Sequence, residues 1–124
     1  MVMDSDSLAI LEKYKYINLE TYKKNGQAVQ TPVWFMISDN TILVQTMNTT
    51  GKIKRIRNNQ KIRIMPCGIR GEPKGEWIEG TAKLADDAKI QEIARLRVKK
   101  YGFKAKMLGM FMKKENLAGI IIQI

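Results

Sequence analysis

Short extended segments separated by turn residues recur along this chain, and they constrain its fold more than any other feature. From Tyr14 onward, polar and apolar residues alternate until Asn25-Gly26, a dipeptide that strongly favours a hairpin when it lies between extended runs. The run 29–37 is rich in β-branched and aromatic residues, and after the turn at 38–40 another strand is predicted over 41–46. We expect these three strands to form an antiparallel meander.

The second run contains Pro32. Because proline cannot donate a hydrogen bond to a sheet ladder, its strand is expected to be an edge, or to have a bulge or an interruption near Thr31. Further strands are predicted over 61–65, 76–84 and 117–124, and a glycine-rich loop is predicted over 68–75.

Helical spacing of apolar residues appears between these strands. A short helix is predicted over 4–13, with Asp4, Ser5 or Asp6 as its cap. A second helix is predicted directly after Thr50, which we expect to cap it. A third helix is predicted over 86–101 and ends at Gly102. A Met-rich helical stretch is predicted over 104–113.

The predicted fold class is therefore mainly β, an antiparallel β-barrel with peripheral helices that forms a single domain over 1–124. Closing about six strands in so short a chain favours a barrel, and an open α+β sheet is the alternative.

The residue types that are absent limit the chemistry. The sequence has no histidine and one cysteine, Cys67, which excludes Ser-His-Asp and Cys-His catalysis, His/Cys metal clusters and an intramolecular disulfide. We expect Cys67 to be a small buried filler. The N-terminus lacks a basic signal-like region, and no apolar run approaches the roughly 20 residues of a membrane helix, so a cytoplasmic protein without a membrane partner is predicted.

Positive charge is concentrated in two stretches of a chain whose net charge is +10. Residues 50–75 hold eight cations and one anion, and residues 89–114 hold nine cations with Glu92 as the only anion. Such stretches indicate a nucleic-acid surface, a site for a phosphorylated small ligand, or solvated charge without a partner. The stretch 50–75 contains no aromatic residue, which argues against single-stranded nucleic acid as the partner.

A candidate anion site lies where the second helix begins. Thr46, Thr50, Gly51, Lys52 and Arg55 would combine a helix N-terminus with a point charge and a planar guanidinium, which suits phosphate. The pattern is not a Walker loop, because Thr46 stands where that motif requires glycine and Ile53 where it requires Ser or Thr. The alternative is a capped helix with exposed cations.

A second candidate is Thr31-Pro32-Val33-Trp34. A strand next to a proline leaves backbone groups that can bind the heteroatom edge of a flat ligand. Trp34 either stacks on that ligand or packs in the hydrophobic core, and for the residue considered alone we favour the core. The segment from Met107 to Met112 either lines a pocket or interface or, again favoured, packs in the core.

These stretches, taken together, resemble the small flavin- and deazaflavin-binding split barrels related to pyridoxamine 5'-phosphate oxidase, in particular the F420-dependent enzyme group. The matching segments are 19–26, 31–35, Thr46, 50–59, 66–71 and 79–82, in the order of the family. The resemblance implies a homodimer with cofactors in the grooves between subunits. It also implies that Thr31, Pro32, Val33 and Trp34 border the cofactor ring, whereas Thr46, Lys52 and Arg55, beside Thr50 and Gly51, hold its phosphate.

The function implied is hydride transfer between bound FMN or coenzyme F420 and a small unsaturated or quinone-like substrate. No catalytic side chain is identified; the proton comes from solvent, or from Tyr101 if that residue reaches the groove. Two other functions stay open: an FMN-binding carrier without turnover, and a small basic barrel that binds single-stranded nucleic acid.

Overall fold

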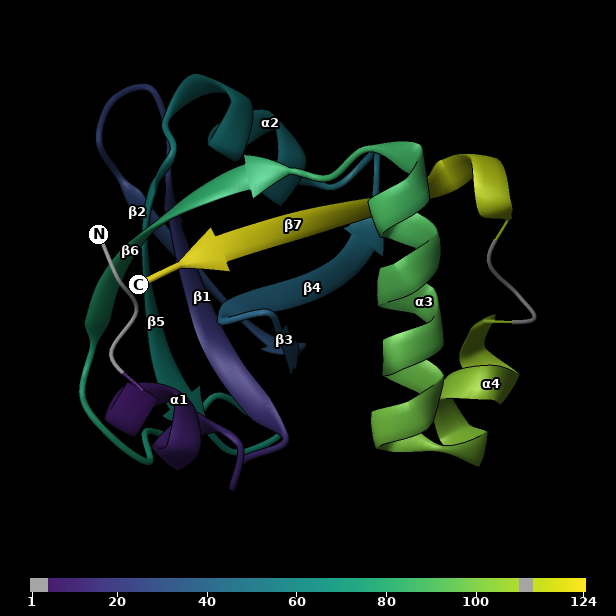
Figure 1. Ribbon diagram of the computed structural model, residues 1–124. Helices are drawn as coiled ribbons and strands as arrows, with labels where there is room; N and C mark the ends of the chain where they lie inside the picture. The colour runs from purple at the N-terminus through teal and green to yellow at the C-terminus, as the bar shows by residue number, and fades with distance from the viewer. Residues whose placement is uncertain (1–4, 110–112) are drawn as a thin grey trace.

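The computed structural model describes residues 5–109 and 113–124. One seven-stranded antiparallel sheet dominates them, in the order β2-β1-β5-β6-β7-β4-β3, and it curls strongly into a half-barrel (Figure 1). The strands are β1 (Tyr16–Tyr22), β2 (Ala28–Trp34), β3 (Met36–Ser38), β4 (Thr41–Met47), β5 (Lys61–Cys67), β6 (Ile78–Leu84) and β7 (Leu117–Gln123). The predicted mainly β architecture with peripheral helices is confirmed.

The predicted meander is wrong. β1 pairs with β2 and β5, whereas β4 pairs with β3 and β7, so β2 and β3 lie at opposite edges of the sheet. The run 29–37 is split at Phe35, whose side chain is fully buried and whose backbone bonds to Tyr101 rather than to a neighbouring strand. Pro32 lies in an edge strand, as its missing N–H predicts.

Both predicted turns are present. Gly26 has φ +89°, and its N–H donates to the Lys23 carbonyl at 2.8 Å, closing the hairpin between β1 and β2. Asp39 and Asn40 both have positive φ, at 51° and 61°, as a type I′ turn between two strands requires. Asp and Asn tolerate this conformation better than other side chains, so the sequence determines the turn locally.

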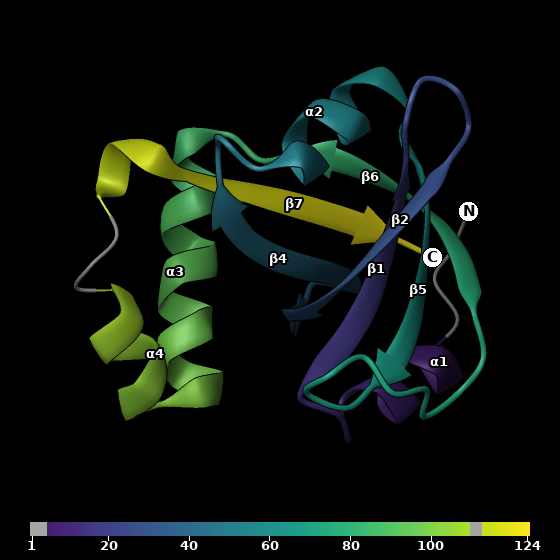
Figure 2. The same cartoon turned by 180° about the vertical axis from the view of Figure 1, so that it is seen from behind.

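The helices lie around the sheet. α2 covers one end of the half-barrel and α1 lies at the other, whereas α3 and α4 stand together beside β3, β4 and β7 (Figures 1 and 2). Their bounds are α1 (Ser5–Leu11), α2 (Gly51–Asn58), α3 (Asp87–Tyr101) and α4 (Phe103–Gly109), with a 3₁₀ turn at Lys114–Asn116. Asp86 caps α3 through the Lys89 N–H, and Gly102, at φ +69°, ends it as predicted. Asp4 and residues 110–112 lie outside the described residues.

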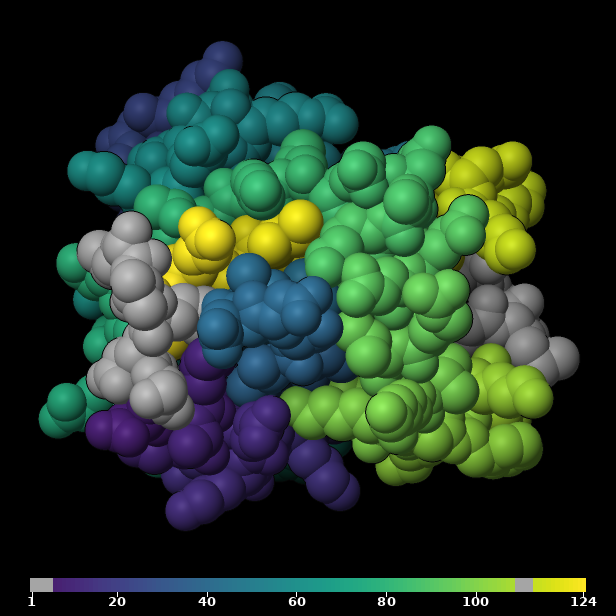
Figure 3. Space-filling model, viewed as in Figure 1, coloured from purple at the N-terminus to yellow at the C-terminus, as the bar shows by residue number. Residues whose placement is uncertain are grey.

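Two apolar layers cover the two faces of the sheet. The inner face of the half-barrel packs against α2 through Ile53 and Ile56. On the outer face, Ile93 of α3 packs with Met36 and Leu43, and the space-filling view shows α3 directly beside the β3–β4 hairpin (Figure 3). Among the described residues, no helix is both long and apolar enough to span a membrane.

Candidate functional site

The first turn of α2 has its amide groups open at the N-terminal end. Thr50 holds the N-cap position, but its hydroxyl donates to the Met47 carbonyl at 3.0 Å and lies 3.1 Å from the Thr46 hydroxyl. The expectation that the Thr50 side chain caps the helix is therefore wrong, because the β4–α2 turn uses that hydroxyl. Backbone N–H groups without a side-chain acceptor at the positive end of a helix are suited to binding an anion.

Arg55 folds back over this first turn. Its Nε donates to the hydroxyl of Thr21 on β1 at 2.6 Å. A Cβ atom added at Gly51 would lie 2.5 Å from the Arg55 Nη1 atom, so the guanidinium occupies the space that the glycine leaves. The side chain is thus fixed between β1 and the start of α2, and it is not a freely solvated cation.

Lys52 stands beside it, half-buried. Burial, and then the charge of Arg55, lower the pKa of Lys52 below its usual range. Within residues 5–109 and 113–124, neither cation has a carboxylate partner. Two like charges partly removed from water without a counter-ion are unfavourable, and a bound anion would stabilise both. The alternative of a capped helix with exposed cations does not describe this arrangement.

The Thr31–Trp34 segment lies on β2, the edge strand that pairs with β1 among the described strands. The register places Thr31 opposite Leu19 and Val33 opposite Ile17, so these side chains share the inner face. The Thr31 hydroxyl is buried and has no hydrogen-bond partner in the described part of the chain. An unpaired hydroxyl beside a free strand edge fits the polar rim of a flat ligand.

β1 connects the two groups of predicted residues. Arg55 binds Thr21, and Thr21 stands two residues from Leu19, which pairs with Thr31. Residues two apart on one strand face are about 7 Å apart. β2 also passes close to β4, which carries Thr46 (Figure 2). The structure therefore brings the cation pair and Thr31 onto one continuous inner surface.

Trp34 does not fill the core as we expected. Its ring is half-buried and stacks on Tyr101 of α3, with ring centres 4.3 Å apart and planes 9° apart. The Tyr101 hydroxyl accepts the Phe35 N–H at 3.0 Å and faces the carbonyls of Lys15 and Phe35 at 2.7 and 2.9 Å. The pKa of Tyr101 is raised to about 12, mainly because the side chain is partly buried. The proton-donor role of Tyr101 stays a prediction, and these three backbone contacts give it a structural role.

We expect Tyr101→Phe to lower the free energy of unfolding by about 1–3 kcal/mol, because the buried Phe35 N–H loses its acceptor. Urea denaturation measures the change. Tyr16→Phe, in the strand that begins beside Lys15, serves as a control for removal of a tyrosine hydroxyl. Unchanged stability combined with lost turnover would contradict the structural role and support Tyr101 as the proton donor.

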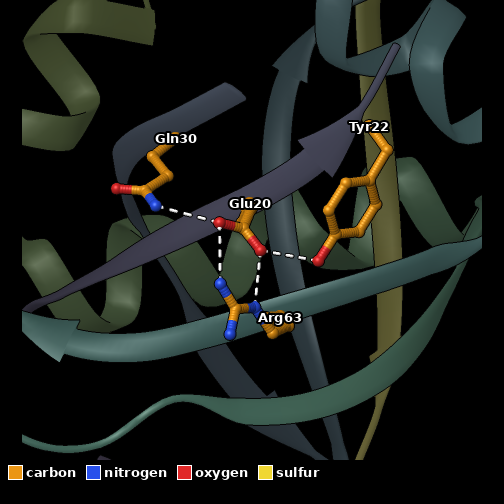
Figure 4. A network of polar contacts seen from close by, with 4 residues as sticks. All are labelled: Glu20, Tyr22, Gln30 and Arg63. Carbon is orange, nitrogen blue, oxygen red and sulfur yellow. Dashed lines mark hydrogen bonds and ion pairs between the residues drawn. The ribbon is translucent and has the colours of Figure 1, made fainter. Parts of the chain in front are cut away.

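A polar network on the outer face was missed by sequence reasoning (Figure 4). Glu20, 1% exposed, accepts from Arg63 Nε at 2.5 Å and Nη2 at 3.0 Å, from the Tyr22 hydroxyl at 2.6 Å and from Gln30 Nε2 at 2.9 Å. These bonds, above all that of Arg63, hold the pKa of Glu20 at about 2. Only the pairing of β1 with β5 places Arg63 opposite Glu20, and no local signal shows that pairing.

A cavity of about 750 Å³ opens on the same outer face, next to this network. Its lining comes from β1, the β1–β2 turn, β5, β6 and the C-terminal end of the described chain: Tyr22, Gly26, Asn59, Lys61, Ile62, Arg63, Glu79, Gly80, Thr81, Gln123 and Ile124. None of the nine predicted cofactor residues is among them.

The two remaining sequence expectations have different outcomes. Cys67 is buried, and burial raises its thiol pKa, so it is a filler as predicted. Met107 and Leu108 of α4 are 47% and 50% exposed, so core packing is wrong for this part of the Met-rich segment. Its end, from Met110 to Met112, lies outside the described residues.

Structural comparisons show where else this architecture occurs. The heme storage protein HutZ from Vibrio cholerae superposes with a TM-score of 0.71 at 13% identity, covering 99% of this chain and 90% of that one. General Stress Protein 26 from Bacillus anthracis superposes with a TM-score of 0.66 at 19% identity, covering 94% of this chain and 84% of that one. An F420 reductase superposes with a TM-score of 0.64 at 15% identity, covering 93% of this chain and 90% of that one. At these identities the likeness establishes the fold.

The family follows from the sequence itself. A comparison with curated proteins finds no match. A family model described as pyridoxamine 5'-phosphate oxidase matches residues 3–119, which is most of the chain. The curled sheet and its helices agree with the split barrels of the structural neighbours. The chain therefore belongs to the pyridoxamine 5'-phosphate oxidase family, whose fold binds flavins.

Proposed function

We propose that this protein is an oxidoreductase that binds FMN or coenzyme F420 and transfers a hydride between it and a small unsaturated or quinone-like substrate. The observation that carries the proposal is the half-buried pair of Lys52 and Arg55, which lacks a counter-ion among the described residues and stands beside open helix amides. Family membership supports a flavin, and an F420 reductase among the structural neighbours supports a deazaflavin as the alternative.

The residues of the site fit a phosphorylated flat cofactor in two parts. Lys52 and Arg55 would neutralise its phosphate, with Gly51 leaving room for the guanidinium. Thr31 would use its unpaired hydroxyl, and the free edge of β2 its backbone groups, to orient the ring. When bound, the cofactor supplies the hydride, and the protein contributes binding, orientation and exclusion of water. Thr46 and Thr50 hold the turn that positions the helix N-terminus.

The proposal includes a cytoplasmic homodimer with a cofactor at each subunit boundary, as the resemblance implies. The exposed side chains of Gln30 and Pro32 on edge strand β2 leave that edge accessible to a second chain. Size-exclusion chromatography with light scattering measures the mass, for which we expect twice the monomer's 14.2 kDa.

A flavin-binding protein without turnover is the second candidate. Its supporting observation is that the Tyr101 hydroxyl, the one side chain suggested as a proton donor beside solvent, is already held by backbone groups of Phe35 and Lys15. Among the structural neighbours, HutZ is described as a heme storage protein, so storage also occurs on this fold.

Binding and turnover distinguish these functions. Protein stripped of ligands is titrated with FMN and with F420 by quenching of ligand fluorescence, and the loaded and reduced protein is then mixed with menadione. We expect one cofactor to bind preferentially and the reduced form to be oxidised by the quinone faster than in free solution. Tight binding without acceleration would favour the carrier, and binding of neither cofactor would contradict both functions.

A further inference from the structure

The short helix α4 presents apolar side chains to solvent. Six large apolar side chains are exposed in the described part of the chain, and three of them lie on α4: Phe103 at 74%, Leu108 at 50% and Met107 at 47%. Figures 1 and 2 show α4 on the far side of α3 from the sheet, at the periphery of the molecule. Single apolar residues scattered over a surface are normal, whereas three on one short helix indicate a contact surface.

Ala105 shows which side of α4 faces the protein. It is 1% exposed, and α4 packs on α3. Because successive residues of an α-helix are rotated by about 100°, Phe103 and Met107 lie opposite Ala105. Lys104 and Lys106 lie on the two sides of this apolar pair, and both are exposed. We call these four exposed residues the α4 stripe, an apolar line with a lysine along each flank.

The charge around the α4 stripe is positive. α4 itself has no acidic residue. The basic stretch 89–114 that contains it has nine cations, and its only anion, Glu92, forms an ion pair with Lys89 at 2.9 Å. Lys99, near the end of α3, is also exposed. A partner that matches this surface must therefore combine negative charge with a layer that accepts apolar side chains.

An anionic lipid surface has both properties. The apolar side chains of an interfacial helix enter the boundary between head groups and acyl chains, and flanking lysines extend to the anionic head groups. A second copy of this chain, docked two-fold on the same surface, would bring the lysines of α4 against one another. Nucleic acid would match the charge, but Met107 and Leu108 have no ring on which a base can stack.

We propose that α4 docks this protein on an anionic membrane surface, with Phe103 and Met107 in the head-group region and the two lysines of the α4 stripe on lipid phosphates. The prediction of no membrane partner rested on the absence of an apolar run long enough to span a bilayer, and a helix that lies in the interface needs no such run. α4 contains none of the residues assigned to the cofactor, so this docking does not depend on the proposed function.

Sedimentation of the full chain with sucrose-loaded vesicles measures the docking. The vesicles contain phosphatidylcholine alone or equal parts of phosphatidylcholine and phosphatidylglycerol. Phe103→Ser combined with Met107→Ser should weaken binding to the mixed vesicles at least about tenfold, as for loss of buried apolar side chains. The control, Ile10→Ser with Ile69→Ser, removes two exposed apolar residues elsewhere and should bind like the wild type. Absence of wild-type binding to the mixed vesicles, or equal weakening in both variants, would overturn the proposal.

A second pair of variants tests the contribution of charge. Lys104→Gln with Lys106→Gln should weaken binding to the mixed vesicles about 25-fold, which is about fivefold for each lysine near an anionic surface. Lys23→Gln with Lys24→Gln removes the same charge from exposed positions in the β1–β2 turn and should cause a clearly smaller loss. An equal loss in both pairs would show attraction by net charge alone and would contradict docking through α4.

A measurement of insertion avoids variants that only lose a contact. Brominated acyl chains quench the fluorescence of a tryptophan that touches them. In mixed vesicles made with brominated phosphatidylcholine, we expect Phe103→Trp to be quenched more than the wild type, which contains Trp34 and Trp77. Ile10→Trp, at an exposed position of α1, should show no such increase. An equal increase in both variants, or none in Phe103→Trp, would overturn the assignment of this helix.

The other two partners give different results. If vesicles do not bind and Phe103→Ser with Met107→Ser lowers the mass found by light scattering, the α4 stripe is an interface between copies of this chain. If vesicles do not bind and a labelled oligothymidylate does, with a loss in Lys104→Gln combined with Lys106→Gln, the partner is nucleic acid. Either result overturns membrane docking and leaves the titrations with FMN and F420 as an independent test of the proposed function.

Discussion

Replacing Arg55 with alanine is expected to weaken binding of FMN by about 1.5–3 kcal/mol, which is the cost of losing a charge-assisted hydrogen bond. The side chain is already oriented before a ligand arrives, because Thr21 accepts from its Nε and Gly51 leaves space for its Nη1. Little side-chain entropy is then lost on binding, so most of the interaction energy contributes to affinity. Isothermal titration calorimetry measures the difference.

Two further variants show whether this loss is specific. Lys52→Ala should weaken FMN binding in the same direction, because Lys52 shares the phosphate with Arg55. Lys54→Ala removes an exposed cation from the same helix and should leave the affinity nearly unchanged. If all three substitutions weaken binding equally, with a steep dependence on salt, the attraction is one of general charge, as for nucleic acid, and the site assignment fails.

Replacing Glu20 with glutamine is expected to lower the free energy of unfolding by about 3 kcal/mol, the largest stability effect that the structure predicts. The carboxylate is 1% exposed and accepts hydrogen bonds from Arg63, Tyr22 and Gln30. A neutral amide has one acceptor oxygen in place of two, so donors are left unpaired beside a cation that has lost its counter-ion. Glu79→Gln, at an exposed position opposite Arg63 on β6, is the control and should change stability little.

The same carboxylate makes stability depend on pH in acid. The pKa of Glu20 falls from 4.5 in the unfolded chain to about 2 in the folded protein. Between these values the unfolded chain binds more protons, so the contribution of Glu20 is complete above about pH 4.5 and is lost as the pH falls toward 2. Urea denaturation across this range should show a decrease that Glu20→Gln largely removes. An identical pH dependence in the parent and the variant would contradict the assignment.

Local sequence signals predicted the parts of the fold that local chemistry determines. Asn25-Gly26 forms its turn, Gly102 ends α3 in a positive-φ conformation, and Pro32 lies in an edge strand. The strand pairing was not predictable in this way. β1 reaches past three intervening strands to pair with β5. The break at Phe35 depends on Tyr101, which is 66 residues away in the sequence.

The candidate site also has one part that the sequence predicted and another that depends on strand pairing. The charges and spacing of Lys52 and Arg55 predicted an anion site, and the family resemblance supplied the ligand. Strand register determines the features that fix this site. These are the contact of Arg55 with Thr21 and the unpaired hydroxyl of Thr31. Register also places Arg63 opposite Glu20. Trp34 was misjudged because its stacking partner, Tyr101, comes from a helix on the other face of the sheet.

The central claim is that the start of α2 holds the phosphate of a flat cofactor, and it is tested most directly by comparing FMN with riboflavin, which lacks the phosphate. Both ligands are titrated into the stripped wild-type protein by calorimetry under the same salt conditions. We predict that FMN binds at least about a hundredfold more tightly than riboflavin, as for two charge-assisted contacts. Equal affinities for FMN and riboflavin would contradict the claim, because the ring would then bind without any contribution from Lys52 and Arg55.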